Sequence, residues 1–190
     1  ENGSTVSTGT ENLSNSQSVT TTYTMNDKQR ITNVNDGVST NVSFVYGLDG
    51  NDSGLVTERT DNKTGLQTSY AYDSRNGMVS SFTVSNGSES HTTMVVYNDY
   101  NDIEQYTDAN NNTTHYYYES SNHNLTRIVD ALGHTTYFEN NSHGAPTRVT
   151  NAMGFIVDYD YNSYGNLNEI SIPSLNLSAT IEYDNVSRMT

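Results

Sequence analysis

The sequence predicts an all-β fold in which repetitive antiparallel β-hairpins of about 20–26 residues are stacked into one continuous sheet or open solenoid. Three observations support this expectation. Aromatic residues followed by polar turns recur at nearly constant spacing, short runs alternate between apolar and polar residues, and Asn, Gly and Asp bound these runs. Only 32% of the 190 residues are hydrophobic, so a thick core is not expected, and the 15 tyrosines must provide much of the buried area.

Residues 1–22 differ in composition from the rest of the chain. They are mostly Ser, Thr, Asn and Gly with a few isolated apolar side chains, and such a segment buries too little surface to offset its ordering entropy. We therefore expect a linker or mobile lead-in over residues 1–22 and a repeat domain over residues 23–190. The segment SVTTTYTM, residues 18–25, is β-branched and suits a strand or an addition to a neighbouring sheet edge.

Seven aromatic residues mark the predicted repeats: Tyr46, Tyr72, Tyr97, Tyr118, Phe138, Tyr161 and Tyr183. They are separated by 26, 25, 21, 20, 23 and 22 residues, a mean of about 23. This period is too short for a pair of helices. Each repeat is therefore expected to be a hairpin-sized element, with the marker residues at equivalent positions.

The clearest repeat runs from Tyr118 to Phe138 and reads YESSNHNLTRIVDALGHTTYF. An aromatic residue and an acidic residue precede a polar turn, an apolar residue then restarts an alternating run, and a second turn follows in DALG at residues 130–133. Related patterns occur in residues 71–82, 159–170 and 182–190. Because Gly and Asn accept the positive φ that tight turns require, two turns and two short strands fill one period.

This pattern resembles the YD repeat of Rhs proteins, Tc-toxin cocoon subunits and teneurins, whose units read approximately YDxxGxLxxxxDxxGxxTxYxYD. The resemblance covers residues 23–190, about seven degenerate units, and is strongest from Tyr97 onward. It implies stacked hairpins that belong to a large structural assembly. The Rhs and Tc families also carry a self-cleaving aspartate centre in motifs that contain Asp-Pro. Here Pro146 follows Ala and Pro173 follows Ile, so that activity is not expected.

The charge and composition exclude several classes of protein. A net charge of −14 argues against a nucleic-acid-binding protein, because phosphates repel such a surface. The absence of cysteine excludes disulfides, thiolate metal ligands and a cysteine nucleophile. No run approaches the roughly 18 apolar residues that span a bilayer, so no membrane span is expected.

Asparagine repeatedly falls into the N-x-S/T acceptor pattern, which is typical of glycosylated surface loops in secreted proteins. The acceptor candidates are Asn41, Asn51, Asn62, Asn86, Asn112, Asn124, Asn140, Asn176 and Asn185. An Asn-, Ser- and Thr-rich chain also generates such patterns by chance, and the composition leaves both interpretations open. Glycosylation favours an extracellular or cell-surface location.

Candidate metal ligands are sparse. The five histidines, His91, His115, His123, His134 and His143, are expected at exits or turns of different repeats and not at a shared site. The segment DGNDSG, residues 49–54, opens like a Ca²⁺ loop, but position twelve is Thr60, and Glu58 comes two residues early. Asp160, Asn162 and Gly165 repeat this opening. We expect plain turns and no cofactor, with weak Ca²⁺ binding as the alternative.

These features favour a non-enzymatic extracellular structural protein that contributes to a fibre, cell surface or adhesion scaffold. A fragment of a toxin-encapsulating Rhs or Tc-type shell is the first alternative. A carbohydrate-binding module, with stacking faces around residues 116–118 and 159–161, is the second. The expected partners are copies of the chain or more of the same protein, paired through sheet edges, and glycans.

Overall fold

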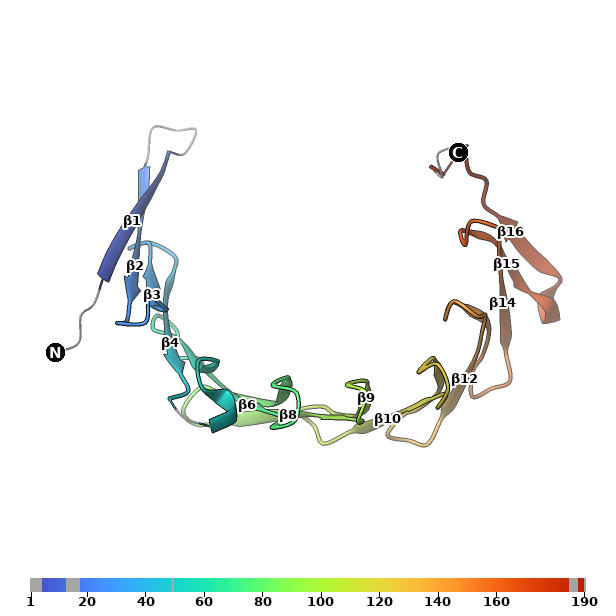
Figure 1. Ribbon diagram of the computed structural model, residues 1–190, viewed down its shortest axis with the longest axis horizontal. Helices are drawn as coiled ribbons and strands as arrows, with labels where there is room; N and C mark the ends of the chain where they lie inside the picture. Colours follow the sequence, from blue (N-terminus) through green and yellow to red (C-terminus); the bar gives the residue numbers. More distant parts are fainter. Residues whose placement is uncertain (1–4, 13–17, 49, 185–187, 190) are drawn as a thin grey trace. The chain divides into compact units, whose positions relative to one another are not determined.

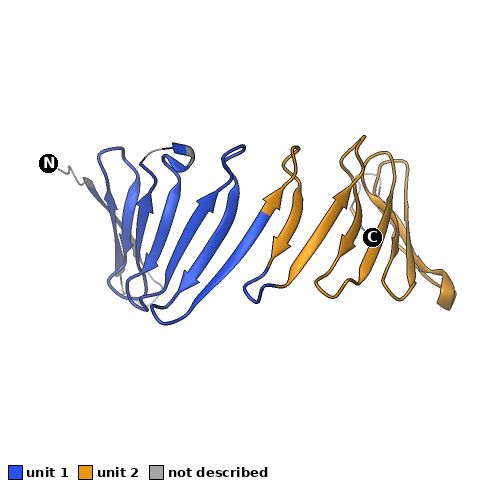
Figure 2. Cartoon of the chain, turned by 90° about the horizontal axis from the view of Figure 1, so that it is seen from below, with its two compact units in different colours: residues 1–95, 108–111 blue, residues 96–107, 112–190 orange. Residues whose placement is uncertain are grey.

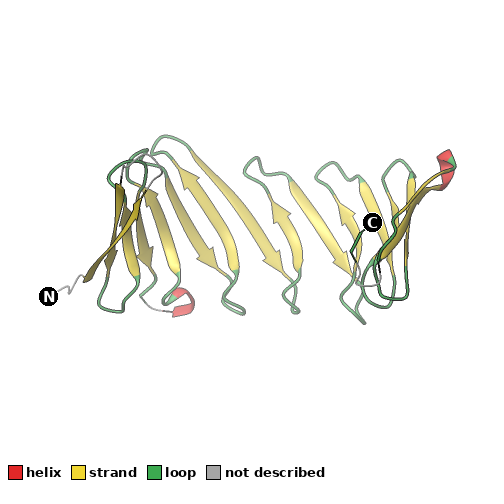
Figure 3. Cartoon of the chain, turned by 90° about the horizontal axis from the view of Figure 1, so that it is seen from above, coloured by secondary structure: helices red, strands yellow, loops and turns green. Residues whose placement is uncertain are grey.

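The computed structural model describes residues 5–12, 18–48, 50–184 and 188–189, and its fold is all-β (Figure 1). Sixteen antiparallel strands are hydrogen-bonded in the order of the sequence (Figure 3). In the described residues β1 and β16 have no pairing with each other, so the order is open. The two helices there are 3₁₀ turns of three residues, Gly50–Asp52 and Pro173–Leu175, and neither is long enough to cross a membrane. The predicted all-β class is confirmed.

The chain divides into two compact units, residues 1–95 with 108–111 and residues 96–107 with 112–190 (Figure 2). The first unit contains β1 (Thr5–Asn12), β2 (Ser18–Met25), β3 (Ile31–Asn35), β4 (Asn41–Tyr46), β5 (Val56–Asp61), β6 (Gln67–Tyr72), β7 (Val79–Ser85) and most of β8 (Ser90–Tyr97). The second contains β9 (Ile103–Thr107), β10 (Thr113–Tyr118), β11 (Leu125–Val129), β12 (Thr135–Asn140), β13 (Pro146–Thr150), β14 (Ile156–Tyr161), β15 (Leu167–Ile172) and β16 (Leu177–Thr180).

The segment predicted as a linker or mobile lead-in differs from that expectation. Strand β1 lies inside it and pairs with β2 in an unbroken register from Thr5↔Met25 to Asn12↔Ser18. Strand β2 covers residues 18–25, the SVTTTYTM segment. The sheet continues through a segment of low apolar content because the pairing is made by backbone groups and by β-branched Thr and Val, which favour extended conformations.

The strands separate apolar from polar side chains by period-two alternation. In the second unit, Phe138, Val149 and Val157 pair across three strands on one face. The neighbouring positions Glu139, Arg148 and Asp158 pair on the other face. Most strand residues are half-buried, and among the described apolar side chains only Val42 and Tyr97 are counted as buried, at 8% and 7% exposure. This fits a sheet without a thick core.

Short hydrogen-bonded turns join the strands. At one edge, Asp130 and Asn151 begin D-x-x-G and N-x-x-G turns, and the amides of Gly133 and Gly154 donate to their backbone carbonyls at 3.0 and 2.9 Å. Both glycines have positive φ, 84° and 79°, a conformation that disfavours residues with a Cβ. The Asp130 side chain also accepts the amides of Leu132 and His134. The repeat's second motif is therefore a hydrogen-bonded turn.

Candidate functional site

The marker tyrosines lie where strand pairing is irregular. Tyr46, Tyr72, Tyr118 and Tyr161 each end a strand immediately after a register shift, a bulge in which the partner strand contributes an extra residue. A bulge bends the strand and redirects the side chain. These positions are therefore geometrically equivalent in their repeats.

Each of these four hydroxyls, and also that of Tyr183, donates a hydrogen bond to a backbone carbonyl of an earlier strand. The bonds are Tyr46 to Ile31 at 2.7 Å, Tyr72 to Val56 at 2.5 Å, Tyr118 to Ile103 at 2.8 Å, Tyr161 to Pro146 at 2.8 Å and Tyr183 to Leu167 at 2.9 Å. We call this series the tyrosine ladder. Burial raises the pKa of Tyr72, Tyr118 and Tyr161, which keeps these hydroxyls protonated as donors.

The tyrosine ladder supplies hydrogen bonds where the backbone pairing between two strands ends two residues before the ladder carbonyl. Between β13 and β14 the last paired residues on this side are Arg148↔Asp158, and Pro146 lies two residues beyond them. The same offset of two separates Val56 from the last pair Glu58↔Ser69. The carbonyl of a residue beyond the last paired position has no backbone partner on the next strand and still needs a hydrogen-bond donor. The tyrosine hydroxyl supplies that donor and fills the space beside it.

The repeat near Phe138 differs from the prediction. The register shift in β12 falls between Glu139 and Asn140, so Asn140 occupies the ladder position, two residues after Phe138. Its side-chain Nδ2 donates to the Leu125 carbonyl at 2.7 Å, as a tyrosine hydroxyl does elsewhere. Phe138 instead pairs with Val149. Phe138 is the aromatic residue nearest to the expected spacing, although steps of 22 residues from Tyr118 and 21 residues to Tyr161 also fit position 140.

Three further repeats differ at or near the ladder position. Met25 follows a register shift in β2, so an apolar side chain holds the position in the first hairpin. Tyr97 is the last residue of β8 and is buried. Tyr183 lies after β16 in an isolated antiparallel bridge with Met189. Met25 and Asn140 are not aromatic, so the spacing of aromatic residues does not identify them. The bulge defines the ladder position, and these two residues occupy it in place of a tyrosine.

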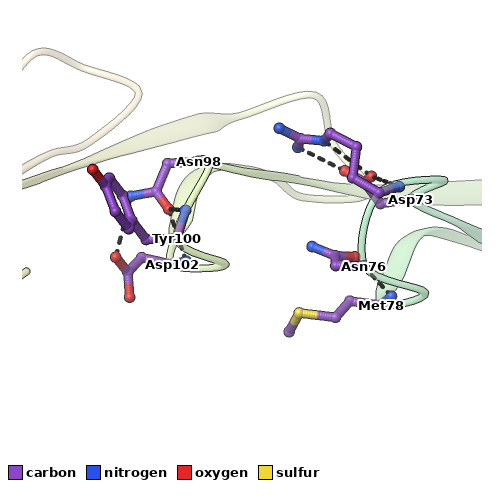
Figure 4. A network of polar contacts seen from close by, with 7 residues as sticks. Asp73, Asn76, Met78, Asn98, Tyr100 and Asp102 are labelled. Carbon is purple, nitrogen blue, oxygen red and sulfur yellow. Dashed lines mark hydrogen bonds and ion pairs between the residues drawn. The ribbon is translucent and has the colours of Figure 1, made fainter.

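The residue after the ladder position begins the turn at this edge. The Oδ1 atoms of Asn98, Asn141 and Asn162 each accept two backbone amides of their own turn, at 2.9–3.1 Å. The close-up of Figure 4 shows this arrangement at Asn98, with a related contact at Asn76. The acidic or amide residue of the aromatic–acidic motif is thus a turn former.

The predicted histidines lie apart from one another. His91 and His115 lie in β8 and β10, and His123, His134 and His143 lie in turns. His123 stacks on Tyr100 with ring centroids 3.8 Å apart. Within the described part of the chain, no three His, Asp or Glu side chains form a group that could hold a metal ion. Asp49 of the Ca²⁺-like segment lies outside the described residues, and Asp160, Asn162 and Gly165 form the end of β14 and an ordinary turn.

The acceptor asparagines differ in exposure and in side-chain contacts. Asn62, Asn86, Asn112 and Asn176 are exposed, and Asn51 and Asn124 lie in turns. Asn41, Asn62 and Asn140 use their side chains in contacts, with Asn62 Nδ2 donating to Asn41 Oδ1 at 3.0 Å. Asn185 lies outside the described residues. Sugar on Asn140 would remove a donor from the ladder.

No family model matches the chain, and no curated protein does either. Solved structures do match. They include TcdB2-TccC3 (16% identity, TM-score 0.68, 96% of this chain and 11% of that one) and TcdB2-TccC3 without its hypervariable C-terminal region (16%, 0.66, 96% and 11%). The Photorhabdus luminescens Tc holotoxin pore also matches (16%, 0.64, 98% and 10%). The chain thus has a YD/Rhs-like repeat fold similar to these Tc-toxin proteins, and it spans about a tenth of their length.

Proposed function

We propose that this chain is a stretch of the wall of a larger YD-repeat shell, with a structural and non-enzymatic role. The observation that carries this proposal is the tyrosine ladder, which repeats one contact from hairpin to hairpin. The similarity to TcdB2-TccC3, over 96% of this chain but 11% of that one, supports a wall segment more than a free-standing module.

A wall built from such repeats extends without new kinds of contact. Each hairpin touches its neighbours, so more repeats lengthen the sheet while local energetics stay the same. The carboxylates support the same role. Asp36 accepts the amides of Val38, Ser39 and Thr40 at 2.7–2.8 Å, and Asp130 holds its own turn in a similar way. Each of these two carboxylates is used within its own turn, which is a structural role.

The proposal includes an extracellular location and glycans on the exposed acceptor asparagines, with more of the same protein as the partner of the sheet edges. Edge strands present unpaired N–H and C=O groups, which natural proteins pair or cover. Neither a cofactor nor a bound metal is part of the proposal. A fibre or adhesion scaffold made of copies of this chain is the competing arrangement.

The native protein provides the test. An antibody raised against this chain would isolate the protein from its source, for intact mass measurement and negative-stain microscopy. We expect a polypeptide several times longer than 190 residues that forms hollow particles. A polypeptide of this length, or filaments assembled from it, would contradict the shell and support the fibre.

A further inference from the structure

The polar face of the second unit carries a row of two tyrosines with an arginine between them. Arg127 of β11 pairs directly with Tyr117 of β10 and with Tyr137 of β12. The guanidinium carbon of Arg127 lies 3.8 Å from the centroid of the Tyr117 ring. Tyr117 and Tyr137 are 40% and 53% exposed, which is high for aromatic side chains within strands. We call these three residues the Tyr–Arg–Tyr row.

A groove of about 460 Å³ lies beside Tyr137. Its lining includes Thr135, two residues before Tyr137 on the same strand, and Thr150, which pairs directly with Tyr137 from β13. His134 and Asn151, from the turns at this edge, complete the polar part of the lining. The volume lies within the roughly 300–1,000 Å³ of small-ligand sites. An exposed ring therefore borders a groove rich in hydroxyl and amide groups.

The polar groups of this groove are held in place and keep hydrogen-bonding capacity. Asn151 Oδ1 accepts the amides of Met153 and Phe155, both at 2.9 Å, which fixes the side chain and leaves its NH₂ group as a donor. His134 Nδ1 lies 2.9 Å from Asp130 Oδ2, which orients the ring and leaves Nε2 for a ligand. Threonine hydroxyls both donate and accept.

Arg127 is the charged component of the site. Arg75, Arg148 and Arg188 each contact an aspartate at 2.6–2.8 Å, whereas Arg127 has no carboxylate within ion-pair distance among the described residues. Arg30 and Arg59 likewise have no ion pair there, and of these three arginines Arg127 is the one that lies between two exposed tyrosines. A guanidinium stacked on an aromatic ring keeps its N–H donors directed outward in its own plane, where a carboxylate binds through two parallel hydrogen bonds.

We propose that the Tyr–Arg–Tyr row and the adjoining groove bind an acidic saccharide. The sugar ring stacks on Tyr137, its hydroxyls bond with Thr135, Thr150 and Asn151, and its carboxylate pairs with Arg127. Two observations support this ligand. The exposed Tyr137 ring suits the apolar face of a sugar, and the Arg127 guanidinium, without an ion pair in the described part of the chain, suits a carboxylate. The chain's overall charge of −14 opposes an acidic ligand, but salt screens charges beyond about 8 Å under physiological conditions.

The test uses the full 190-residue chain and two probes, a glucuronate-containing tetrasaccharide and a neutral tetrasaccharide of the same length. Titration followed by ¹⁵N NMR reports both affinity and location. We expect the acidic probe to bind about tenfold more tightly and to shift the amides of β11–β13. Tyr137→Ala should weaken binding at least tenfold, Tyr137→Phe should retain it, and Arg127→Gln should remove the preference for the acidic probe.

Tyr164→Ala is the matched control, because this tyrosine is 84% exposed on a turn that lines neither the row nor the groove, and the variant should bind like the parent chain. Unchanged NMR spectra away from the substitution show that each variant is folded. The proposal fails if neither probe binds at ~10 mM, if both bind equally well, or if Tyr137→Ala binds as the parent does. This outcome is independent of the shell proposal, which concerns the native length and assembly.

Discussion

The hydroxyl of Tyr161 donates a 2.8 Å hydrogen bond to the carbonyl of Pro146, and Pro146 is the residue that pairs with Asn140 one repeat earlier. Asn140 in turn donates to Leu125, which pairs with Tyr118. Successive ladder positions are thus linked through one carbonyl each. Strand pairing and side-chain contacts alternate along the edge, and the loss of one ladder donor leaves one half-buried carbonyl without its partner.

Asn140 gives the first prediction. Asn140→Ala removes the donor to Leu125 and should reduce the free energy of unfolding by about 1 kcal/mol. Asn140→Tyr restores the residue found at most ladder positions, and its hydroxyl should reach the same carbonyl. We expect it to be at least as stable as the parent. Urea unfolding monitored by circular dichroism measures both, and equal losses in the two variants would argue against Asn140 as a ladder member.

Two glycines with similar backbone conformations form a second test. Gly133 and Gly144 have φ of 84° and 82°, so alanine at either position costs about 1–2 kcal/mol of backbone strain. A Cβ on Gly144 would lie 2.7 Å from Asn124 Oδ1, whereas one on Gly133 meets nothing within 4 Å. Gly144→Ala should therefore lower the urea midpoint more than Gly133→Ala. The reverse order would show that the turns of neighbouring repeats do not pack in this way.

Acid should destabilise the fold through aspartates whose pKa values are lowered in the folded state. The Ser39 hydroxyl and the amides of Thr40, Val38 and Ser39 hold the pKa of Asp36 well below its usual value, and Arg148 lowers that of Asp158. In the unfolded chain these carboxyls protonate near pH 4. Below that pH the unfolded state binds more protons, so stability is present above about pH 4 and is lost as the pH falls toward the folded pKa values.

Asp36→Asn isolates one of these contributions, since the amide keeps an acceptor for the turn but does not titrate in this range. Urea unfolding from about pH 2 to 6 should show a shallower loss of stability for the variant than for the parent chain. Parallel curves would mean that Asp36 protonates equally in the folded and unfolded states.

The sequence predicted the architecture because its signals are local. Alternation, turn residues and the spacing of tyrosines each depend on a few neighbouring residues, and all of them indicate stacked hairpins. Asn140 and Met25 could not be predicted in the same way. Their role depends on the register shift beside them, and a one-residue change in strand pairing is not visible in composition or spacing.

The Tyr–Arg–Tyr row could not be predicted from the sequence either. Tyr117 and Tyr137 lie 20 positions apart in the sequence and come to the same face only through the pairings of Arg127. The stacking faces predicted from the sequence, around residues 116–118 and 159–161, include Tyr117 but not Tyr137, and adjacent residues of a strand point to opposite faces. Exposure distinguishes them, and exposure follows from the register in which consecutive strands pair.

The tyrosine ladder itself is tested most directly by removing single hydroxyls. Tyr118→Phe and Tyr161→Phe keep the rings but remove the donors to Ile103 and Pro146. Each should lower the free energy of urea unfolding by about 0.5–1.5 kcal/mol. Tyr164→Phe, on an exposed turn, should stay within about 0.5 kcal/mol of the parent chain. If all three variants were equally stable, the hydroxyl contacts would not hold the repeats together.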